Sequence, residues 1–372
     1  MNQGFFDEQT EQSYKKAKIV HDYFVAWSRV IKAHWTGPIG YIDLYSGPGK
    51  YSDGTLSVPL LIVNEIIKDP KLVSRMLLAF NDADGDNIRK LEAEIRAIPG
   101  TEGLIRRIAF STDIVDSEFC EKIRINQRIP VLSFIDPFGY KGLTIELINR
   151  LLANKGSDCI FFFNYNRINM ALSSNSFFDE HLSALFGNEK MVRLKKELTS
   201  FAPAEREKVV IKALLESLKE NTANYILPYK FYCTDMKRTS HYIIFVTKHI
   251  TGCKIMKSIM YSNSAKDVDA VATFELKDKV NFGSQSEQLS LFSRPLDELC
   301  DILKKRYKGK RENVEAICNE IVYDNGSMFV FANVKDALRR LEDDGIVKIE
   351  GRKKETFCGV KTMPDEAFAV FI

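Results

Sequence analysis

The chain has 372 residues, of which 45% are hydrophobic and 28% charged, as in an ordinary globular protein with room for about two domains. Its 53 basic and 50 acidic residues give a formal net charge of +3, so nucleic-acid binding would depend on local basic patches. Seven cysteines without a Cys-x-x-Cys pair argue against a disulfide framework and against a zinc site. No apolar run approaches the ~18 residues of a membrane span and no leader pattern opens the chain, which predicts a cytoplasmic protein.

The first predicted element is an amphipathic helix over residues 10–33, with Lys15, Lys16 and Lys18 on its polar face. Short apolar strands then alternate with amphipathic helices. The strands are expected at 39–45, 76–81, 105–110, 131–135 and 159–163, and the helices at 58–68, 87–98, 117–126 and 144–152. Strands that are apolar throughout and joined through helices are typical of a parallel sheet buried on both faces.

A glycine-containing turn, Ser46-Gly47-Pro48-Gly49, follows the first of these strands. Glycines at such a position let the backbone approach a ligand closely, and nucleotide-like ligands bind at the carboxyl ends of strands in open α/β sheets. The turn lacks the third glycine of the dinucleotide fingerprint and the Gly-Lys-Ser/Thr of a P-loop. An ordinary strand-to-helix turn is therefore the alternative to a cofactor loop.

Polar residues stand at the ends of the predicted strands. They are Asp43, Asn81, Asp82, Thr112, Asp113, Asp136 and Asn164, in chain order. Because the carboxyl ends of parallel strands meet at one edge of a sheet, we expect these side chains along a single rim. The alternative is that some of the acids cap the helices that follow, as Asp86 is expected to do before Asn87.

Residues 165–225 are richer in polar side chains and predict a helical insertion, with helices at 177–186 and 207–220. Two β-rich runs at 225–234 and 240–248 then predict an antiparallel hairpin. A parallel sheet closed by such a hairpin is the Rossmann-like α/β sheet of class I methyltransferases. This first domain is expected to span residues 1–262.

A polar linker is predicted at 263–294, followed by a second domain at 295–372. Three helices at 296–307, 311–323 and 334–344 and a hairpin at 346–350 and 356–360 indicate a winged-helix-like fold. Arg339, Arg340 and Lys353 are candidates for contact with nucleic acid, through a helix in a groove and a basic wing. Acidic residues nearly balance the basic ones here, so a protein-binding module is the alternative.

These segments together resemble the three-Cys-motif partner protein (TcmP) family, whose members are similar to class I S-adenosylmethionine-dependent methyltransferases. The resemblance covers residues 10–262. It is carried by Tyr41-Ile-Asp-Leu-Tyr-Ser-Gly-Pro-Gly-Lys-Tyr, Asp53-Gly-Thr, Ser57-Val-Pro-Leu, Phe134-Ile-Asp-Pro-Phe-Gly, Asn164-Tyr-Asn-Arg-Ile-Asn and Tyr242-Ile-Ile-Phe-Val-Thr-Lys-His. The family is named for a three-cysteine motif in a partner encoded beside its members, and this chain itself lacks that motif.

The resemblance implies S-adenosylmethionine as the cofactor. Its amino-acid end would lie against Tyr45 and the turn with Gly47 and Gly49, and its ammonium would meet Asp43. Asp82 would accept hydrogen bonds from the ribose, and Asp113 would lie near the adenine amino group. Helix capping, or exposure in a loop, is the alternative role of each acid.

The segment Asp136-Pro137-Phe138-Gly139 stands where amino-methyltransferases that act on bases carry Asp/Asn-Pro-Pro-aromatic. There the acid accepts hydrogen bonds from the target amine and the aromatic side chain stacks on the base. The aromatic residue has moved up one place here, which leaves an amine target open. Asp136, Pro137 and Phe138 are thus candidate catalytic residues, with a tight turn as the alternative, while Asn164 and Arg167 could hold a substrate phosphate.

The predicted function is therefore methyl transfer to nucleic acid or to a modified nucleotide. The alternative is a non-catalytic, methyltransferase-like partner that binds nucleic acid or protein and works with a separate enzyme. A third reading is a Mg²⁺-dependent phosphodiesterase that uses the rim carboxylates. The expected partners are nucleic acid and a protein of the three-Cys-motif type, with no membrane and no dedicated metal site.

Overall fold

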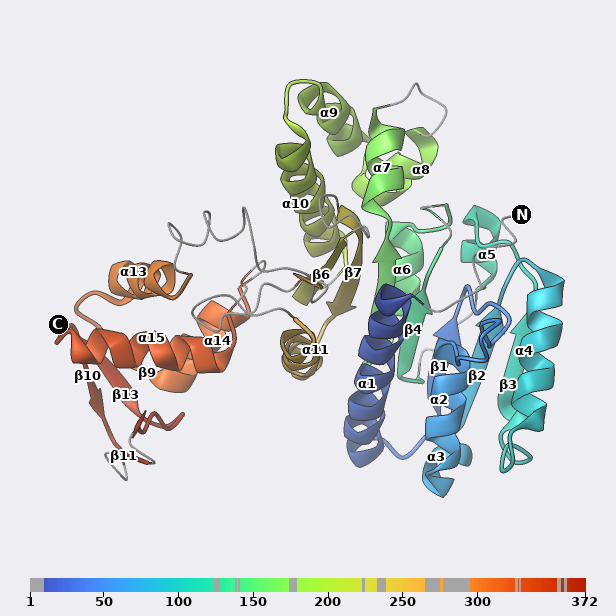
Figure 1. The fold of residues 1–372 in the computed structure, drawn as a ribbon, viewed down its shortest axis with the longest axis horizontal. Helices are drawn as coiled ribbons and strands as arrows, with labels where there is room; N and C mark the ends of the chain where they lie inside the picture. The colour runs from blue at the N-terminus through green and yellow to red at the C-terminus, as the bar shows by residue number, and fades with distance from the viewer. Residues whose placement is uncertain are drawn as a thin grey trace. The chain divides into compact units, whose positions relative to one another are not determined.

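The computed structural model describes residues 10–123, 128–137, 139, 141–173, 179–222, 225–232, 239–264, 275–276, 295–324, 327, 329–352, 356–357 and 360–372. The chain divides into two compact units, Met1–Ile259 and Met260–Ile372 (Figure 1). No helix in the described part of the chain combines the length and apolar character that a membrane crossing requires.

Seven strands of the first unit form a mixed sheet. They are β1 (Ile39–Asp43), β2 (Met76–Asn81), β3 (Ile108–Ser111), β4 (Val131–Ile135), β5 (Asp158–Phe163), β6 (Tyr225–Tyr232) and β7 (Thr239–Thr247). Their order is β3-β2-β1-β4-β5-β7-β6, with the first five strands parallel and β7 antiparallel to both of its neighbours. This confirms the predicted α/β fold with a Rossmann-like class I methyltransferase sheet. The predicted hairpin loop lies at 233–238, outside the described residues.

The strand order places a topological switch point between β1 and β4. The chain runs outward from β1 to β2 and β3, then returns to the other side of β1 as β4. Ligands of open α/β sheets bind beside such a point, at the carboxyl ends of the strands. Asp43 and Asp136 end or follow these two strands, so both stand at the switch point.

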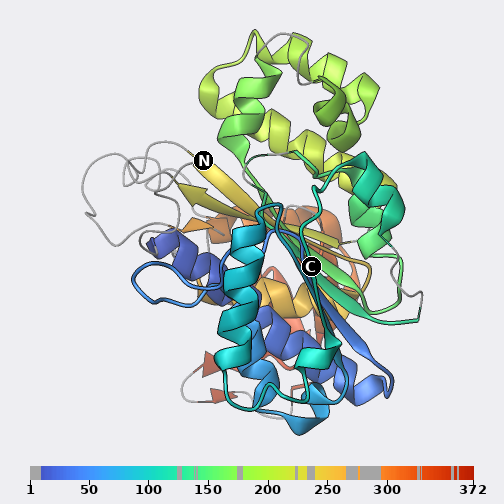
Figure 2. The same cartoon turned by 90° about the vertical axis from the view of Figure 1, so that its right-hand side faces the viewer.

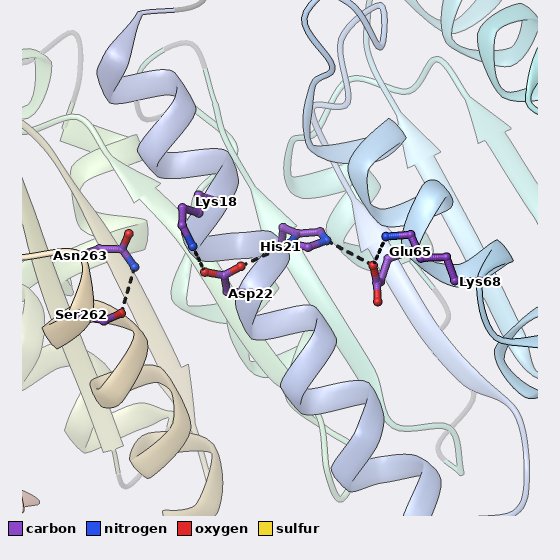
Figure 3. Close-up of polar contacts among 7 residues, drawn as sticks. All are labelled: Lys18, His21, Asp22, Glu65, Lys68, Ser262 and Asn263. Atoms are coloured by element: carbon purple, nitrogen blue, oxygen red, sulfur yellow. Dashed lines mark hydrogen bonds and ion pairs between the residues drawn. The ribbon is translucent and has the colours of Figure 1, made fainter.

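Helices cover both faces of the sheet (Figure 2). Those of the first half are α1 (Glu11–His34), α2 (Val58–Ile67), α3 (Pro70–Val73), α4 (Gly85–Ala97), α5 (Ser117–Lys122) and α6 (Ile145–Leu151). The apolar face of α1 packs on the sheet, where Tyr23 contacts Phe245 and Phe24 contacts Tyr41 edge to face. A chain of polar contacts joins α1 to α2, running Lys18–Asp22–His21–Glu65–Lys68 (Figure 3).

Four helices form the predicted insertion between β5 and β6. They are α7 (Tyr165–Leu172), α8 (Asp179–Phe186), α9 (Asn188–Leu198) and α10 (Pro203–Asn221), and α11 (Ile250–Ser262) follows β7. The sequence prediction contained α8 and α10 but omitted α7, α9 and α11. In α7 and α9, polar residues interrupt the apolar spacing, and only three or four side chains of each are buried.

Two predicted boundaries in the first unit are wrong. Residues Ile105–Arg107 form a 3₁₀ turn, and β3 begins only at Ile108. Helix α4 begins at Gly85, and its cap is Asp84, whose side chain accepts a hydrogen bond from the amide of Asp86. Asp86 therefore lies in the first turn, where its carboxylate favours the helix dipole, and it does not cap the helix.

The second unit contains three helices and short antiparallel strands. They are α13 (Pro295–Tyr307), β9 (Arg311–Asn313), α14 (Val314–Val322), α15 (Phe331–Asp343), β10 (Val347–Glu350), β11 (Thr356–Phe357), β12 (Val360–Lys361) and β13 (Phe368–Phe371). The two-residue strand β8 (Glu275–Leu276) comes earlier in the chain and belongs to neither of the two small sheets of this unit. The expected pairing of 346–350 with 356–360 is wrong, because β10 pairs with β13 and β11 with β12. Pairing with β13 sets Val347 and Ile349 opposite Phe371 and Ala369, so that all four side chains enter the core. Residues 311–313 were expected to be helical, but they pair with β13.

Candidate functional site

Two hollows lie along the carboxyl edge of the parallel strands. The first, which we call the acidic cavity, has a volume of about 50 Å³ and is lined by Lys16, Asp43, Gly47, Asp136 and their neighbours. The second, the open cleft, has a volume of about 740 Å³ and is lined by Asp113, Ile114, Pro137, Lys141, Arg167 and Met170. Tyr45 and Asp82 line both hollows. The strand-end acids predicted to share a rim thus border one continuous stretch of surface.

Asp43 is the most deeply buried acid of the acidic cavity, with 1% of its surface exposed. The amide of Tyr45 donates to its Oδ1 at 3.1 Å, whereas Oδ2 has no hydrogen-bond partner among the residues that the structure describes. Burial raises the pKa of Asp43 to about 8; the Tyr45 amide opposes this rise, Asp136 and Asp82 add to it, and Lys16 opposes it. The carboxyl therefore keeps its proton through much of the neutral range, and its Oδ2 can accept a hydrogen bond from a ligand once that proton is lost.

Lys16 of α1 reaches the same cavity, which the sequence analysis did not foresee. Its Nζ donates to Asp136 Oδ2 at 2.5 Å and lies 4.4 Å from the centre of the Phe162 ring. Burial lowers the pKa of Lys16, but Asp136, Tyr51 and Asp43 outweigh burial, so the pKa is raised overall. The lysine is therefore a charged member of the site and not a solvated residue of the polar helix face.

Asp82 holds the glycine turn in place. Its Oδ2 accepts a hydrogen bond from the amide of Gly47 at 2.9 Å, and its Oδ1 accepts from the amide of Asp84 at 2.9 Å and from Asn87 Nδ2 at 3.3 Å. The side chain is 6% exposed and borders both hollows. A carboxylate has about four acceptor positions, so Asp82 can still accept a bond from a ligand hydroxyl.

The two glycines of the turn play different parts. Both have positive φ, 63° at Gly47 and 91° at Gly49. Gly47 lines the acidic cavity. Gly49 lines neither hollow, and a Cβ added there would lie 2.9 Å from Leu91 Cδ1 and 3.2 Å from Leu60 Cδ1. Gly49 thus lets the turn pack against α2 and α4, away from the ligand side.

Asn81 is a second residue to which the sequence analysis assigned no role. Its Nδ2 donates to the carbonyls of Leu44 and Asp113 at 3.1 and 3.0 Å, and its Oδ1 accepts from the Asp113 amide at 2.9 Å and from Ser111 Oγ at 2.8 Å. This buried amide therefore ties the ends of β1, β2 and β3 together. Its place as the polar last position of an apolar strand marked it in the sequence, but did not indicate this role.

The open cleft is less enclosed than the acidic cavity. Ile114 and Met170 are 70% and 72% exposed within it. Pro137 lines the cleft, and Phe138 lies outside the described residues. Asn164 does not line either hollow; its side chain caps α7 by accepting from the Arg167 amide at 3.1 Å. Of the predicted substrate residues in the first unit, Arg167 alone borders the cleft.

In the second unit, the predicted nucleic-acid residues are engaged in contacts of their own. Arg339 donates to the Lys361 carbonyl at 2.9 Å and to Asp336 Oδ1 at 2.6 Å. Arg340 donates to Asp297 Oδ1 at 3.0 Å, and Lys353 lies outside the described residues. Neither arginine is therefore a free cation for phosphate.

Among the described residues, no three His, Cys, Asp or Glu side chains gather in a way that could hold a metal ion. The rim acids accordingly do not form a hard-cation site of the kind a Mg²⁺-dependent phosphodiesterase needs. The unpaired carboxyl oxygen of buried Asp43, beside the ammonium of Lys16, instead suits a ligand group that carries both a positive and a negative charge. The neighbouring cleft offers acid and apolar contacts suited to a nucleoside.

No known family model and no curated protein matches the sequence. Solved structures with a similar arrangement include a Legionella pneumophila protein of the DUF519 family (11% identity, TM-score 0.35, 62% of this chain and 85% of that one). They also include the methyltransferase domain of bacterial CtHen1-C (11%, 0.30, 62% and 100%) and a chain of the fibrillarin/Nop5p complex (11%, 0.31, 61% and 84%). These likenesses are distant, and the strand order of the chain itself identifies its fold.

Proposed function

We propose that this protein is an S-adenosylmethionine-dependent methyltransferase of the TcmP type that acts on nucleic acid or on a modified nucleotide. The observation that carries the proposal is that the acidic cavity and the open cleft meet at Tyr45 and Asp82. S-adenosylmethionine has a charged amino-acid end, a ribose and an adenine in the same order. The two hollows offer suitable contacts for each part in turn.

At the amino-acid end, the free Oδ2 of Asp43 would accept a hydrogen bond from the ammonium. Lys16 would bind the carboxylate together with the hydroxyl of Ser57, which is buried and has no partner in the described part of the chain. Asp82 would accept from the ribose, Asp113 would lie near the adenine amino group, and Ile114 would contact the adenine face. The cofactor would supply a methyl group on a positively charged sulfur, and the protein would bind and orient both reactants.

A second candidate function is a non-catalytic, methyltransferase-like partner of a separate enzyme, such as a three-Cys-motif protein. The ion pair between Lys16 and Asp136 favours this second candidate, because Lys16 occupies the carboxylate that an enzyme acting on amines would use. A cavity of about 50 Å³ also leaves room for little more than a few water molecules unless Lys16 moves.

The test is calorimetric titration of the purified protein with S-adenosylmethionine and S-adenosylhomocysteine. We expect binding of one equivalent, weakened about tenfold in Ile114→Ala, because the shorter side chain covers less of the adenine face. Val192→Ala is the matched control, since Val192 of α9 is also exposed, at 59%, and lines neither hollow. An ammonium beside Asp43 favours its ionised form, so binding near pH 7 should also release protons, and Asp43→Asn should abolish that release.

Folded wild-type protein that gives no heat with either ligand would reject the proposal. Binding without transfer of a labelled methyl group to oligonucleotides or nucleotides, alone or with a partner protein, would favour the second candidate.

A further inference from the structure

The basic residues that line the open cleft have no role in the cofactor binding proposed above. Lys141 follows β4 and Arg167 lies in the first turn of α7; both side chains are exposed and line the cleft. Neither side chain forms an ion pair or hydrogen bond with any residue that the structure describes. The cleft is also lined by Asp82 and Asp113, so it carries charges of both signs.

The backbone that carries these two cations is held firmly. The stem of Arg167 lies against Gly139, where an added Cβ would be 3.4 Å from Arg167 Cδ. The carbonyl of Lys141 accepts a hydrogen bond from the Tyr45 hydroxyl at 3.1 Å. The next residue, Gly142, is so close to its neighbours that a Cβ would lie 2.3 Å from the Val115 carbonyl oxygen and 2.6 Å from the Tyr45 hydroxyl. Both cations, which have no partner among the described residues, are therefore carried at the cleft by well-packed backbone.

An apolar side chain accompanies the charges. Met170 lies three residues after Arg167, on the same face of α7, and 72% of its surface is exposed. Only the terminal Ile372, at 78%, exceeds it among the exposed large hydrophobic residues of the described chain. A flexible thioether at a cleft mouth suits a flat apolar group.

We propose that Lys141 and Arg167 bind the phosphate of a nucleotide substrate, and that Met170 contacts its base. The inference rests on the proposed function in one respect, namely that Asp82 and Asp113 bind the cofactor. Acids repel a phosphate while cations attract it, so the phosphate would bind at Lys141 and Arg167 and not at the two acids. A volume of about 740 Å³ is large enough for a nucleoside and part of a second nucleotide unit.

The test measures fluorescence anisotropy of a labelled single-stranded oligonucleotide, as RNA and as DNA, with and without S-adenosylhomocysteine. The double variant Lys141→Ala/Arg167→Ala should bind at least tenfold more weakly. The slope of log affinity against log salt should fall by about 0.7 for each phosphate that the variant no longer neutralises. Met170→Ala should weaken binding by less and leave the salt slope unchanged, because it removes no charge.

The matched control is Arg107→Ala/Lys155→Ala. These two exposed cations precede β3 and β5, at the amino-terminal edge of the sheet, and line neither hollow. Competition by a nucleoside 5′-monophosphate, but not by the nucleoside, would show that the phosphate group is what the site binds. A monophosphate that competes as well as the oligonucleotide would identify the substrate as a free nucleotide. Wild-type affinity in the Lys141/Arg167 variant, or an equal loss in the control, would overturn the proposal.

Titration of the same proteins with S-adenosylhomocysteine separates the two proposals. Oligonucleotide binding that depends on Lys141 and Arg167 in a protein that does not bind the cofactor would leave the phosphate site standing and reject the methyltransferase. Cofactor binding without any nucleotide binding would do the reverse.

Discussion

The acidic cavity and the open cleft share one rim of the sheet but differ in almost every physical property. The cavity is small, and its cation is paired with one of its acids, as Lys16 is with Asp136. The cleft is about fifteen times larger by volume, about 740 against 50 Å³, and its cations and apolar side chains are exposed. A closed, charge-matched pocket selects one ligand group strictly, whereas an open cleft with free charges accepts a class of ligands.

Tyr45 forms the wall between the two hollows. Its amide bonds to Asp43 on the cavity side, and its hydroxyl bonds to the Lys141 carbonyl on the cleft side. The separation of the two hollows therefore depends on the Tyr45 side chain and on the loop that holds it.

The substitution expected to disturb the boundary between the two hollows most is Gly142→Ala. At φ +82° a Cβ is strained, and here it would also meet the Val115 carbonyl and the Tyr45 hydroxyl, so we expect a loss of about 3 kcal/mol in the free energy of unfolding. Gly54→Ala, at φ +84° with nothing within 4 Å, should lose only about 1 kcal/mol. Urea unfolding measures both, and equal losses would contradict the packing argument.

The next effect concerns the charge balance of the cavity. Lys16→Met should reduce the free energy of unfolding by about 2 kcal/mol, because it leaves Asp136 without its cation in a largely enclosed site. In Lys16→Met/Asp136→Asn part of that loss should be recovered. Lys18→Met, two residues away on the same helix, breaks the more exposed pair with Asp22 and should cost less than about 0.5 kcal/mol. Chemical denaturation of the four proteins would show whether the buried pair behaves differently from the exposed one.

A further effect is a dependence on pH that only the cavity should show. Because the pKa of Asp43 rises from 3.8 to about 8 on folding, the folded protein binds a proton that the unfolded chain releases. The contribution of this group to stability is complete below pH 3.8 and is lost as the pH rises through 8. Wild-type protein should therefore lose stability relative to Asp43→Asn between pH 5 and 8, by at most about 1.4 kcal/mol per pH unit.

Unfolding curves at several pH values would test this, with Asp113→Asn as the comparison because that acid is exposed in the cleft. A parallel pH profile for wild type and Asp43→Asn would mean that the buried carboxyl is ionised throughout.

The sequence predicted the architecture better than it predicted the cavity. Strands such as β4 and β5 are apolar throughout and short, a pattern that a buried parallel sheet explains and an amphipathic helix does not. The pairing of β10 with β13 was missed because partners in a sheet can lie far apart in the chain, and the nearer segment at 356–360 suggested a hairpin. Pattern alone carries no information about such distant pairing.

The sequence pattern also predicted some single residues of the site and missed others. Strand-end acids could be expected on one rim because all parallel strands end at the same edge. Lys16 could not be assigned there, since it is 120 residues from Asp136 and its place on a helix with other lysines suggested a solvated side chain. Gly49 and Gly47 look alike in the sequence, and only the packing of Leu60 and Leu91 separates the core glycine from the one that faces the cavity.

The hydrogen bond from the Gly47 amide to Asp82 has one more consequence. Because this bond, together with those from Asp84 and Asn87, fixes the turn within the protein itself, the turn does not have to become ordered when a ligand arrives. Little conformational entropy is then lost on association at this position. A ligand would therefore bind there to a preformed turn, without a disorder-to-order transition of the backbone.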